Sequence, residues 1–177
     1  TAIGNFGIAN TFVVLISFVA SPITTMLFPA FSKLNPQKDK ATLLSVFQFS
    51  VKYASLLVVP VSALVMCLAE PAVSTLFGET YSTAPRFLAL LTISYWYTAF
   101  GSLSLGNFII SQGKTKFYLY LFILQAVIGF PMGYILIMQL GVLGLIVTTL
   151  LAQIPMIIIM LYWIRKHYEL TVDWRSS

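Results

Sequence analysis

Residues 117–164, FYLYLFILQAVIGFPMGYILIMQLGVLGLIVTTLLAQIPMIIIMLYWI, form a run of 48 residues without a single charged side chain. A helix that crosses a membrane needs about 20 mostly apolar residues, so this run is too long for one span. It divides at QLGVLG, residues 139–144, where two glycines indicate a tight turn. We therefore expect two antiparallel membrane spans, at about 117–139 and 142–164. Gly129 and Gly133, four residues apart, predict that the first of these helices packs closely on a neighbouring helix.

The composition of the whole chain also indicates a membrane protein. Of the 177 residues, 59% are hydrophobic and only 8% are charged, and the mean hydropathy is +0.92. Soluble domains carry about 25% charged residues, so a surface this poor in charge would not stay in water. The net charge of +5 comes without a basic patch interleaved with aromatic residues, which excludes nucleic acid as an expected partner. The expected partner is the lipid bilayer.

Three further apolar windows, of which the second contains Lys52 and the other two no charge, complete an all-α membrane domain of five spans. We expect these spans at about 5–31, 43–69 and 87–111. The expected connections are loops at 32–42 and 112–116, a tail at 165–177, and a segment at 70–86 that carries a short helix ending near Gly78. The chain is treated as one transmembrane domain covering residues 1–177.

The basic residues predict how these spans are oriented. Lys and Arg collect on the cytosolic side of membrane proteins. With strict alternation of five spans, one side holds Lys33, Lys38, Lys40, Lys114, Lys116, Arg165, Lys166 and Arg175. The other side holds Arg86, Glu70 and Glu79. We therefore expect the N-terminus outside and the C-terminus in the cytosol, and an N-terminus outside without a signal peptide suggests further spans upstream.

Prolines inside the expected spans are candidates for helix kinks. Each removes a backbone hydrogen bond, and neighbouring helices or a water-filled cavity must satisfy the freed carbonyl. Kinks in four of five spans favour a moving, transporter-like bundle, although membrane helices in general contain more proline than soluble ones. The four candidates are Pro22, Pro60, Pro131 and Pro155.

Two groups of side chains inside the spans are candidates for lining a substrate cavity. Four polar residues of the first span fall within about 60° of one another on a helical wheel, so they face protein or water, as cavity lining or as helix packing. Three aromatic residues lie about 13 Å along the third span from Arg86, which is too deep for an interfacial belt, so they contact a sugar ring or pack in the core. The two groups are Asn10, Ser17, Ser21 and Thr24, and Tyr95, Trp96 and Tyr97.

Lys52 is the one charged residue within the second expected span, and no acidic residue lies within ten positions of it. If the membrane-embedded part of this span begins near residue 50, the side chain simply extends to the interface. If the helix enters near Leu43, Lys52 lies roughly 13 Å deep and needs an aqueous cavity or an anion. The sequence leaves both positions open.

No pattern typical of an enzyme, a cofactor or a metal site is present. The chain has no glycine-rich phosphate loop and no paired carboxylates within a span. Cys67 is the single cysteine and His167 the single histidine, and they lie far apart in the sequence. We therefore expect neither catalysis nor a bound metal or cofactor.

Four segments together resemble a known family. They are ISFVASPITTMLFPAFSKL (16–34), KYASLLVVPVSALVMCLAEPAVSTLFGETYSTAPRFLALL (52–91), NFIISQGKTKFYLYLFILQAVIG (107–129) and LGVLGLIVTTLLAQ (140–153). In order and spacing they resemble the C-terminal part of polysaccharide flippases of the multidrug/oligosaccharidyl-lipid/polysaccharide (MOP) exporter superfamily. "LFPAFSK", "LFGETY" and "GKTK" are the most specific pieces.

The resemblance implies two six-helix lobes around a central cavity, as in a MATE-like transporter. The five expected spans would then be most of the second lobe, and the partner would be the N-terminal lobe of the same protein. It further implies translocation of polyprenyl- or dolichyl-linked saccharides across the cell membrane by alternating access. No motif for a coupling ion can be transferred to this chain. The alternatives are a multidrug or cation antiporter of the same superfamily, and a scaffold subunit that transports nothing.

Overall fold

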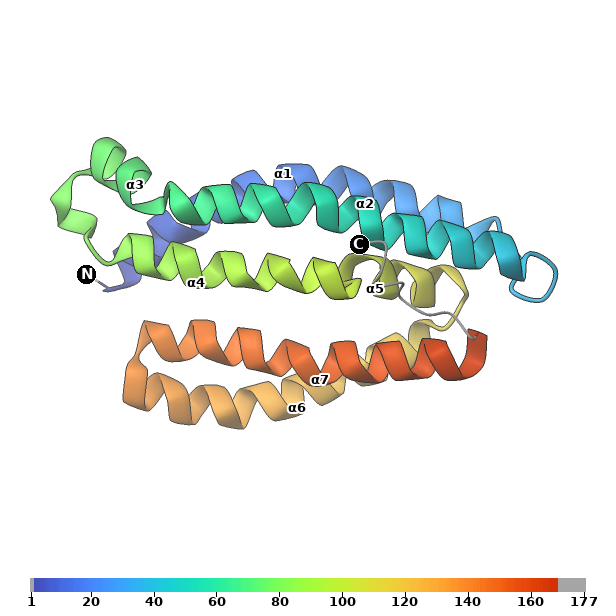
Figure 1. Ribbon diagram of the computed structural model, residues 1–177. Coiled ribbons are helices and arrows are strands. Elements are labelled where there is room, and N and C mark those ends of the chain that lie inside the picture. The colour runs from blue at the N-terminus through green and yellow to red at the C-terminus, as the bar shows by residue number, and fades with distance from the viewer. Residues whose placement is uncertain (1, 169–177) are drawn as a thin grey trace.

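The computed structural model describes residues 2–168 of the chain, and this part is all-helical, which confirms the expected fold class (Figure 1). The helices follow from long apolar runs that contain no charge and few breaking residues. In chain order the elements are α1 (Ala2–Ser32), α2 (Lys40–Cys67), α3 (Ala69–Phe77), the 3₁₀ turn η1 (Glu79–Tyr81), α4 (Ala84–Trp96), the 3₁₀ turn η2 (Tyr97–Phe100), α5 (Ser102–Ser111), α6 (Thr115–Leu140) and α7 (Val142–Tyr168).

Four of these helices, α1, α2, α6 and α7, are long and apolar enough to cross a membrane, and α4 to α5 makes a fifth span if the bent pair counts as one. Large apolar side chains cover the outside of the bundle: Phe18 is 71% exposed and Phe130 is 80% exposed. Such a surface is stable against lipid and not against water. The chain is therefore a multi-pass helical membrane protein, while the side of the membrane that each loop faces stays a prediction.

The helices form two groups. Helices α1 and α2 lie side by side with α4 packed against both, and α6 and α7 form a hairpin that contacts α4 and α5 (Figure 1). The largest core cluster joins α1, α2 and α5 to the hairpin of α6 and α7. There the ring of Phe108 makes edge-on contacts with Phe31 and Phe47, at centroid distances of 5.4 and 5.8 Å. Edge-to-face pairs of this kind each add about 0.5–1.5 kcal/mol to the burial itself.

Glycines bring α6 and α7 into close contact, and the predicted close-approach pair Gly129 and Gly133 takes part in it. The turn between them is Gly141 alone, which adopts a positive φ of 59°. One turn later, a side chain at Gly144 would collide with the backbone of Leu136 on α6. A Cβ at Gly133 would lie 3.3 Å from Thr148, and one at Gly129 would lie 3.6 Å from Ala152. The hairpin is therefore held by backbone proximity rather than by large side chains.

The third span, expected at about 87–111, is broken in the structure. The structure breaks it into α4 with η2 and then α5, and the two parts are bent by 57°. The bend lies at Gly101 and involves no proline. In contrast, α1, α2, α6 and α7 each continue as one α-helix past Pro22, Pro60, Pro131 and Pro155. The kinks proposed at those prolines stay predictions.

Candidate functional site around the helix break

The break in the third span is set by one residue. Gly101 has φ 80° and ψ 18°, the left-handed region that glycine adopts without strain. Its N–H donates to the carbonyl of Thr98, and its own carbonyl accepts from the N–H of Leu105, so the two helix ends meet here. A Cβ at this position would lie 3.1 Å from Val51 Cγ2. Both the backbone conformation and the packing therefore require glycine.

The break lies beside the middle of α2. Val51 of α2 faces Gly101. Its neighbour Ser50 forms a hydrogen bond of 2.9 Å within the core to Ser104, which lies about one turn after Gly101 on α5. Gly101 is ten residues from the end of α5 at Ser111, which is about 15 Å along a straight helix. The break is therefore well inside the bundle, and Lys52 follows directly after the residue that packs on it.

Lys52 is partly buried and belongs to a polar face of α2. At 100° per residue, Ser45, Gln48, Lys52 and Ser55 fall within about 80° of one another. All four are partly buried. Ser55 Oγ donates to the carbonyl of Lys52 at 2.9 Å, so the backbone here is satisfied locally. We call these four residues the α2 polar face.

Carboxylates are distant from Lys52 along the chain. The acidic residues that the structure describes are Asp39, Glu70 and Glu79, and all of them lie beyond the two ends of α2. Asp39 precedes Lys52 by 13 residues, about 20 Å along the helix. A carboxylate must come within about 4 Å to form an ion pair. No acidic residue of α2 itself is available to neutralise the ammonium group.

The predicted polar face of α1 is only partly turned toward another helix. Asn10 and Ser21 are exposed, and Ser17 and Thr24 are partly buried. Ser17 Oγ lies 2.9 Å from the hydroxyl of Tyr95 on α4, which joins two of the predicted site residues. Thr24 Oγ1 instead donates to the carbonyl of Ser21 within α1. The structure therefore places Ser17 in a contact between helices and leaves Asn10 and Ser21 on the surface.

The aromatic triplet immediately before the break points in three directions. Tyr95 reaches α1, as described, whereas the hydroxyl of Tyr97 donates to the carbonyl of Leu150 on α7 at 3.0 Å. Trp96 is 41% exposed. The three residues therefore do not form one stacking surface. Two of them connect the broken span to helices on either side.

A small cavity lies on the other side of the break, between α5, α6 and α7. It measures about 190 Å³, and its polar lining consists of Ser102, Tyr118, Gln125 and Gln153. Ser102 is the first residue after Gly101. Each glutamine amide offers both donors and an acceptor, so this cavity can hold water or a polar group.

These features escaped sequence reasoning for identifiable reasons. Gly101 was the signal for the break, since it is one of two glycines in an apolar run and lies near its middle. The α2 polar face has spacings of three, four and three residues, which a helical wheel would have revealed. Gln125 and Gln153 are 28 positions apart on two helices, and no pattern in the sequence brings them together.

Nothing in the described part of the chain indicates a metal site. No group of three His, Cys, Asp or Glu residues there is arranged to hold an ion. Cys67 is exposed, and His167 Nδ1 lies 3.0 Å from the carbonyl of Trp163 in the same helix.

The fold and the site together define a multi-spanning membrane protein with one broken span and a cationic, polar face at the level of the break. Residues 1–86 match the family described as "Polysaccharide biosynthesis protein". The match ends at Arg86, so it covers just under half of the 177 residues. It includes α1, α2 and α3, hence Lys52 and the polar face of α1. No curated protein and no solved structure gives a significant match.

Over residues 1–86, the family match agrees with the part of the sequence resemblance that concerns polysaccharide biosynthesis. It supports a role in polysaccharide biosynthesis at a membrane. The break at Gly101 and the hairpin of α6 and α7 lie outside the matched range.

Proposed function

We propose that the chain is part of a flippase that moves polyprenyl- or dolichyl-linked saccharides across the cell membrane by alternating access. Such a substrate has a lipid tail that stays in the bilayer, and a sugar and phosphate that must pass through the protein. Within the chain, the proposed role is binding and movement, without covalent chemistry. The remaining part of the cavity would come from the N-terminal lobe that the resemblance implies.

The observation that carries the proposal is the juxtaposition of the break at Gly101 with α2 at the level of Lys52. Transporters often form their substrate sites from discontinuous helices, because the ends of the half-helices present unpaired backbone groups inside the membrane. Here α5 begins at the break, and the N-terminal end of a helix carries a partial positive charge. A positive helix end and the ammonium group of Lys52 at one level favour an anion such as a phosphate.

The depth of the break also favours a binding role for Lys52. A charge near the middle of a bilayer is costly unless it meets water or a counter-ion. Lys52 lies close to the midpoint of α2, which spans residues 40–67. The polar neighbours Gln48 and Ser55 on the same face are the kind of groups that line an aqueous cavity. These points support the deeper of the two positions that the sequence leaves open.

The proposal is tested with the full-length protein reconstituted into liposomes that contain a fluorescent lipid-linked saccharide. We expect wild-type protein to move the label across the membrane, Lys52→Ala to abolish this movement, and Lys52→Arg to retain part of it. Lys38→Ala, in the loop between α1 and α2, is the matched control for the loss of one positive charge. Protein level in the liposomes is measured for each variant.

Two outcomes would overturn parts of the proposal. If the wild-type protein does not move the labelled saccharide, the flippase function is wrong, and movement of a cationic dye instead would support the antiporter alternative. If Lys52→Ala flips at the wild-type rate, Lys52 serves only to anchor α2 at the interface. A scaffold subunit would show neither activity.

A further inference from the structure

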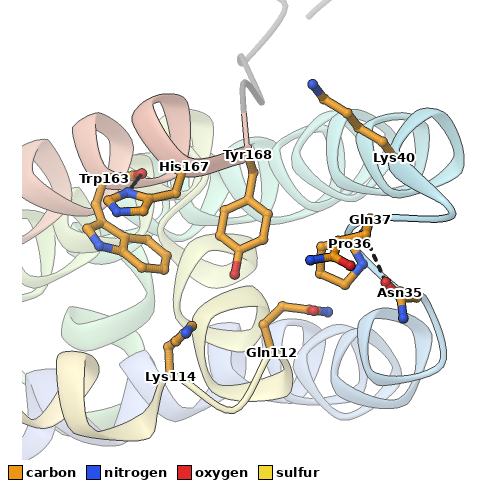
Figure 2. Close-up of a pocket in the computed structure, with 9 residues that line it drawn as sticks. All are labelled: Asn35, Pro36, Gln37, Lys40, Gln112, Lys114, Trp163, His167 and Tyr168. Atoms are coloured by element: carbon orange, nitrogen blue, oxygen red, sulfur yellow. Dashed lines mark hydrogen bonds between the residues drawn. The ribbon is translucent and has the colours of Figure 1, made fainter.

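Three segments that are distant in the sequence meet at one end of the bundle and enclose a second, larger cavity (Figure 2). They are the loop at 33–39 between α1 and α2, the turn at 112–114 between α5 and α6, and the last turn of α7. The cavity measures about 730 Å³. It is separate from the break at Gly101, which lies about 15 Å further along α5.

One wall of this cavity consists of aromatic rings that hold each other in place. Trp163 stacks between Phe117 and His167, with centroid distances of 4.6 Å to each and interplanar angles of 24° and 25°. The ring of Tyr168 packs edge-on against Phe108 at 5.0 Å. Figure 2 shows the hydroxyl of Tyr168 pointing toward the side where Gln112 and Lys114 lie. The wall is therefore rigid and presents an O–H group to the cavity.

The opposite side is formed by a loop whose polar groups are largely used to fix its own shape. The backbone N–H of Asn35 donates to Asp39 Oδ2 at 3.0 Å, and the N–H of Gln37 donates to Asn35 Oδ1 at 2.9 Å. Gln112 Nε2 donates to the carbonyl of Phe31 at 2.9 Å, which ties the α5–α6 turn to the end of α1. The Asp39 carboxylate is held inside this loop and does not line the cavity. The cavity is thus preformed rather than a gap between mobile segments.

The charged side chains around the cavity are nearly all positive. Lys40 and Lys114 line it together with the imidazole of His167, and no carboxylate does so among the described residues. In Figure 2, Lys114 extends toward the cavity from below, whereas the ammonium group of Lys40 extends outward from its rim. More basic side chains surround this end: Lys33, Lys38, Lys116, Arg165 and Lys166. Asp39 is the one acidic residue that the structure describes here, and Glu169 and Asp173 lie outside the described range.

We propose that this cavity binds a phosphate-bearing group, presented either by the headgroup of an anionic lipid or by free phosphate or diphosphate. Lysine binds phosphate as a point charge, and the Tyr168 hydroxyl adds a directional donor. Basic pockets at the ends of membrane helices bind acidic headgroups for the same reason. The proposal concerns binding at the end of the bundle and holds whether or not the chain translocates a saccharide.

The test compares two double variants with the same change in charge. Lys40→Gln with Lys114→Gln removes the two lysines that line the cavity. Lys38→Gln with Lys116→Gln removes two lysines that lie two positions away and do not line it. Loss of one lysine that contacts the phosphate should cost about 1 kcal/mol, which corresponds to about a fivefold change in affinity. Lys114 extends toward the cavity and Lys40 lies at its rim, so the cavity pair should lose about fivefold or more in affinity. The control lysines do not line the cavity and are screened by water and salt, so their loss should change the affinity about twofold or less.

Two probes distinguish the sources of the phosphate. Inorganic diphosphate is titrated calorimetrically into the whole chain in phosphatidylcholine nanodiscs, which contain no anionic lipid. Retention of phosphatidylglycerol is measured by native mass spectrometry after release from mixed-lipid nanodiscs. A response to diphosphate assigns the site to a soluble phosphate, and retention of phosphatidylglycerol assigns it to a headgroup.

Binding that the two variant pairs weaken equally would overturn the proposal, because diffuse surface charge would then explain it. Absence of binding with both probes would also overturn it. The charge-preserving variant Lys40→Arg with Lys114→Arg should bind within about threefold of wild type, since Arg also pairs with phosphate. Loss of binding in this variant together with normal helix content would equally contradict a charge-based site.

Discussion

Replacing Gly101 by alanine tests whether this single residue sets the break. An L-residue in the left-handed region costs about 1–2 kcal/mol. The added Cβ would also lie 3.1 Å from Val51 Cγ2, and overpacking of this kind costs about 1–3 kcal/mol. Together these effects predict that Gly101→Ala lowers the free energy of unfolding by about 2–5 kcal/mol.

The assay is reversible unfolding of the purified protein in mixed micelles with increasing SDS, followed by circular dichroism. Gly7→Ala is the matched control, because Gly7 lies in α1 with ordinary helical backbone and nothing within 4 Å of the added Cβ. In a helix, alanine is more favourable than glycine by about 1 kcal/mol, so this control should be neutral or stabilising.

A double-mutant cycle separates the two causes of the loss. Val51→Ala removes the methyl group that the new Cβ would meet and leaves the backbone strain unchanged. We expect Gly101→Ala and Val51→Ala together to lose about 1 kcal/mol less than the sum of the single variants. If Gly101→Ala is as stable as wild type, the break does not depend on glycine and the reasoning is refuted.

Two further contacts make quantitative predictions. Ser17→Ala and Tyr95→Phe each remove the 2.9 Å contact between α1 and α4, and a double-mutant cycle in SDS unfolding should give a coupling of about 0.6–1 kcal/mol; a coupling of zero would contradict the contact. Gly144→Ala places a methyl group against the backbone of Leu136 and should destabilise the hairpin by about 3 kcal/mol or more. In the same unfolding assay Gly129→Ala, which makes an ordinary 3.6 Å contact with Ala152, should change stability by less than about 1 kcal/mol, and equal effects of both variants would contradict the described packing.

Much of the fold was predictable because charge and hydropathy decide where a chain can cross a membrane. The length of the run 117–164 requires two spans, and its glycines indicate where they separate. In the structure α6 and α7 meet at Gly141. The short helix after α2 ends at Phe77, directly before Gly78, as the positive φ of that glycine requires. These features depend on local sequence.

The site was less predictable because its parts come together only through packing. Ser17 and Tyr95 are 78 positions apart. Each lies in an apolar run, and hydropathy does not indicate which neighbouring helix a side chain in such a run faces. The bend at Gly101 was hidden for a related reason: residues 87–111 are long enough and apolar enough for a straight span, so length gave no reason to expect a break. The sequence predicted kinks at prolines, whereas the bend in the described part of the chain lies at a glycine.

The way the helices pair has a consequence for how the chain enters the membrane. Helix α1 packs mainly on α4 and α5, which are synthesised after α2 and α3. The polar residues of α1 can therefore form their contacts with these helices only after the later segments have left the ribosome. The hairpin of α6 and α7 instead makes most of its contacts between neighbours in sequence. Low contact order of this kind favours fast formation, so the hairpin can insert as a finished unit. The hydroxyl of Tyr97, which donates to the carbonyl of Leu150, is one of the contacts that connect the hairpin to the rest of the bundle.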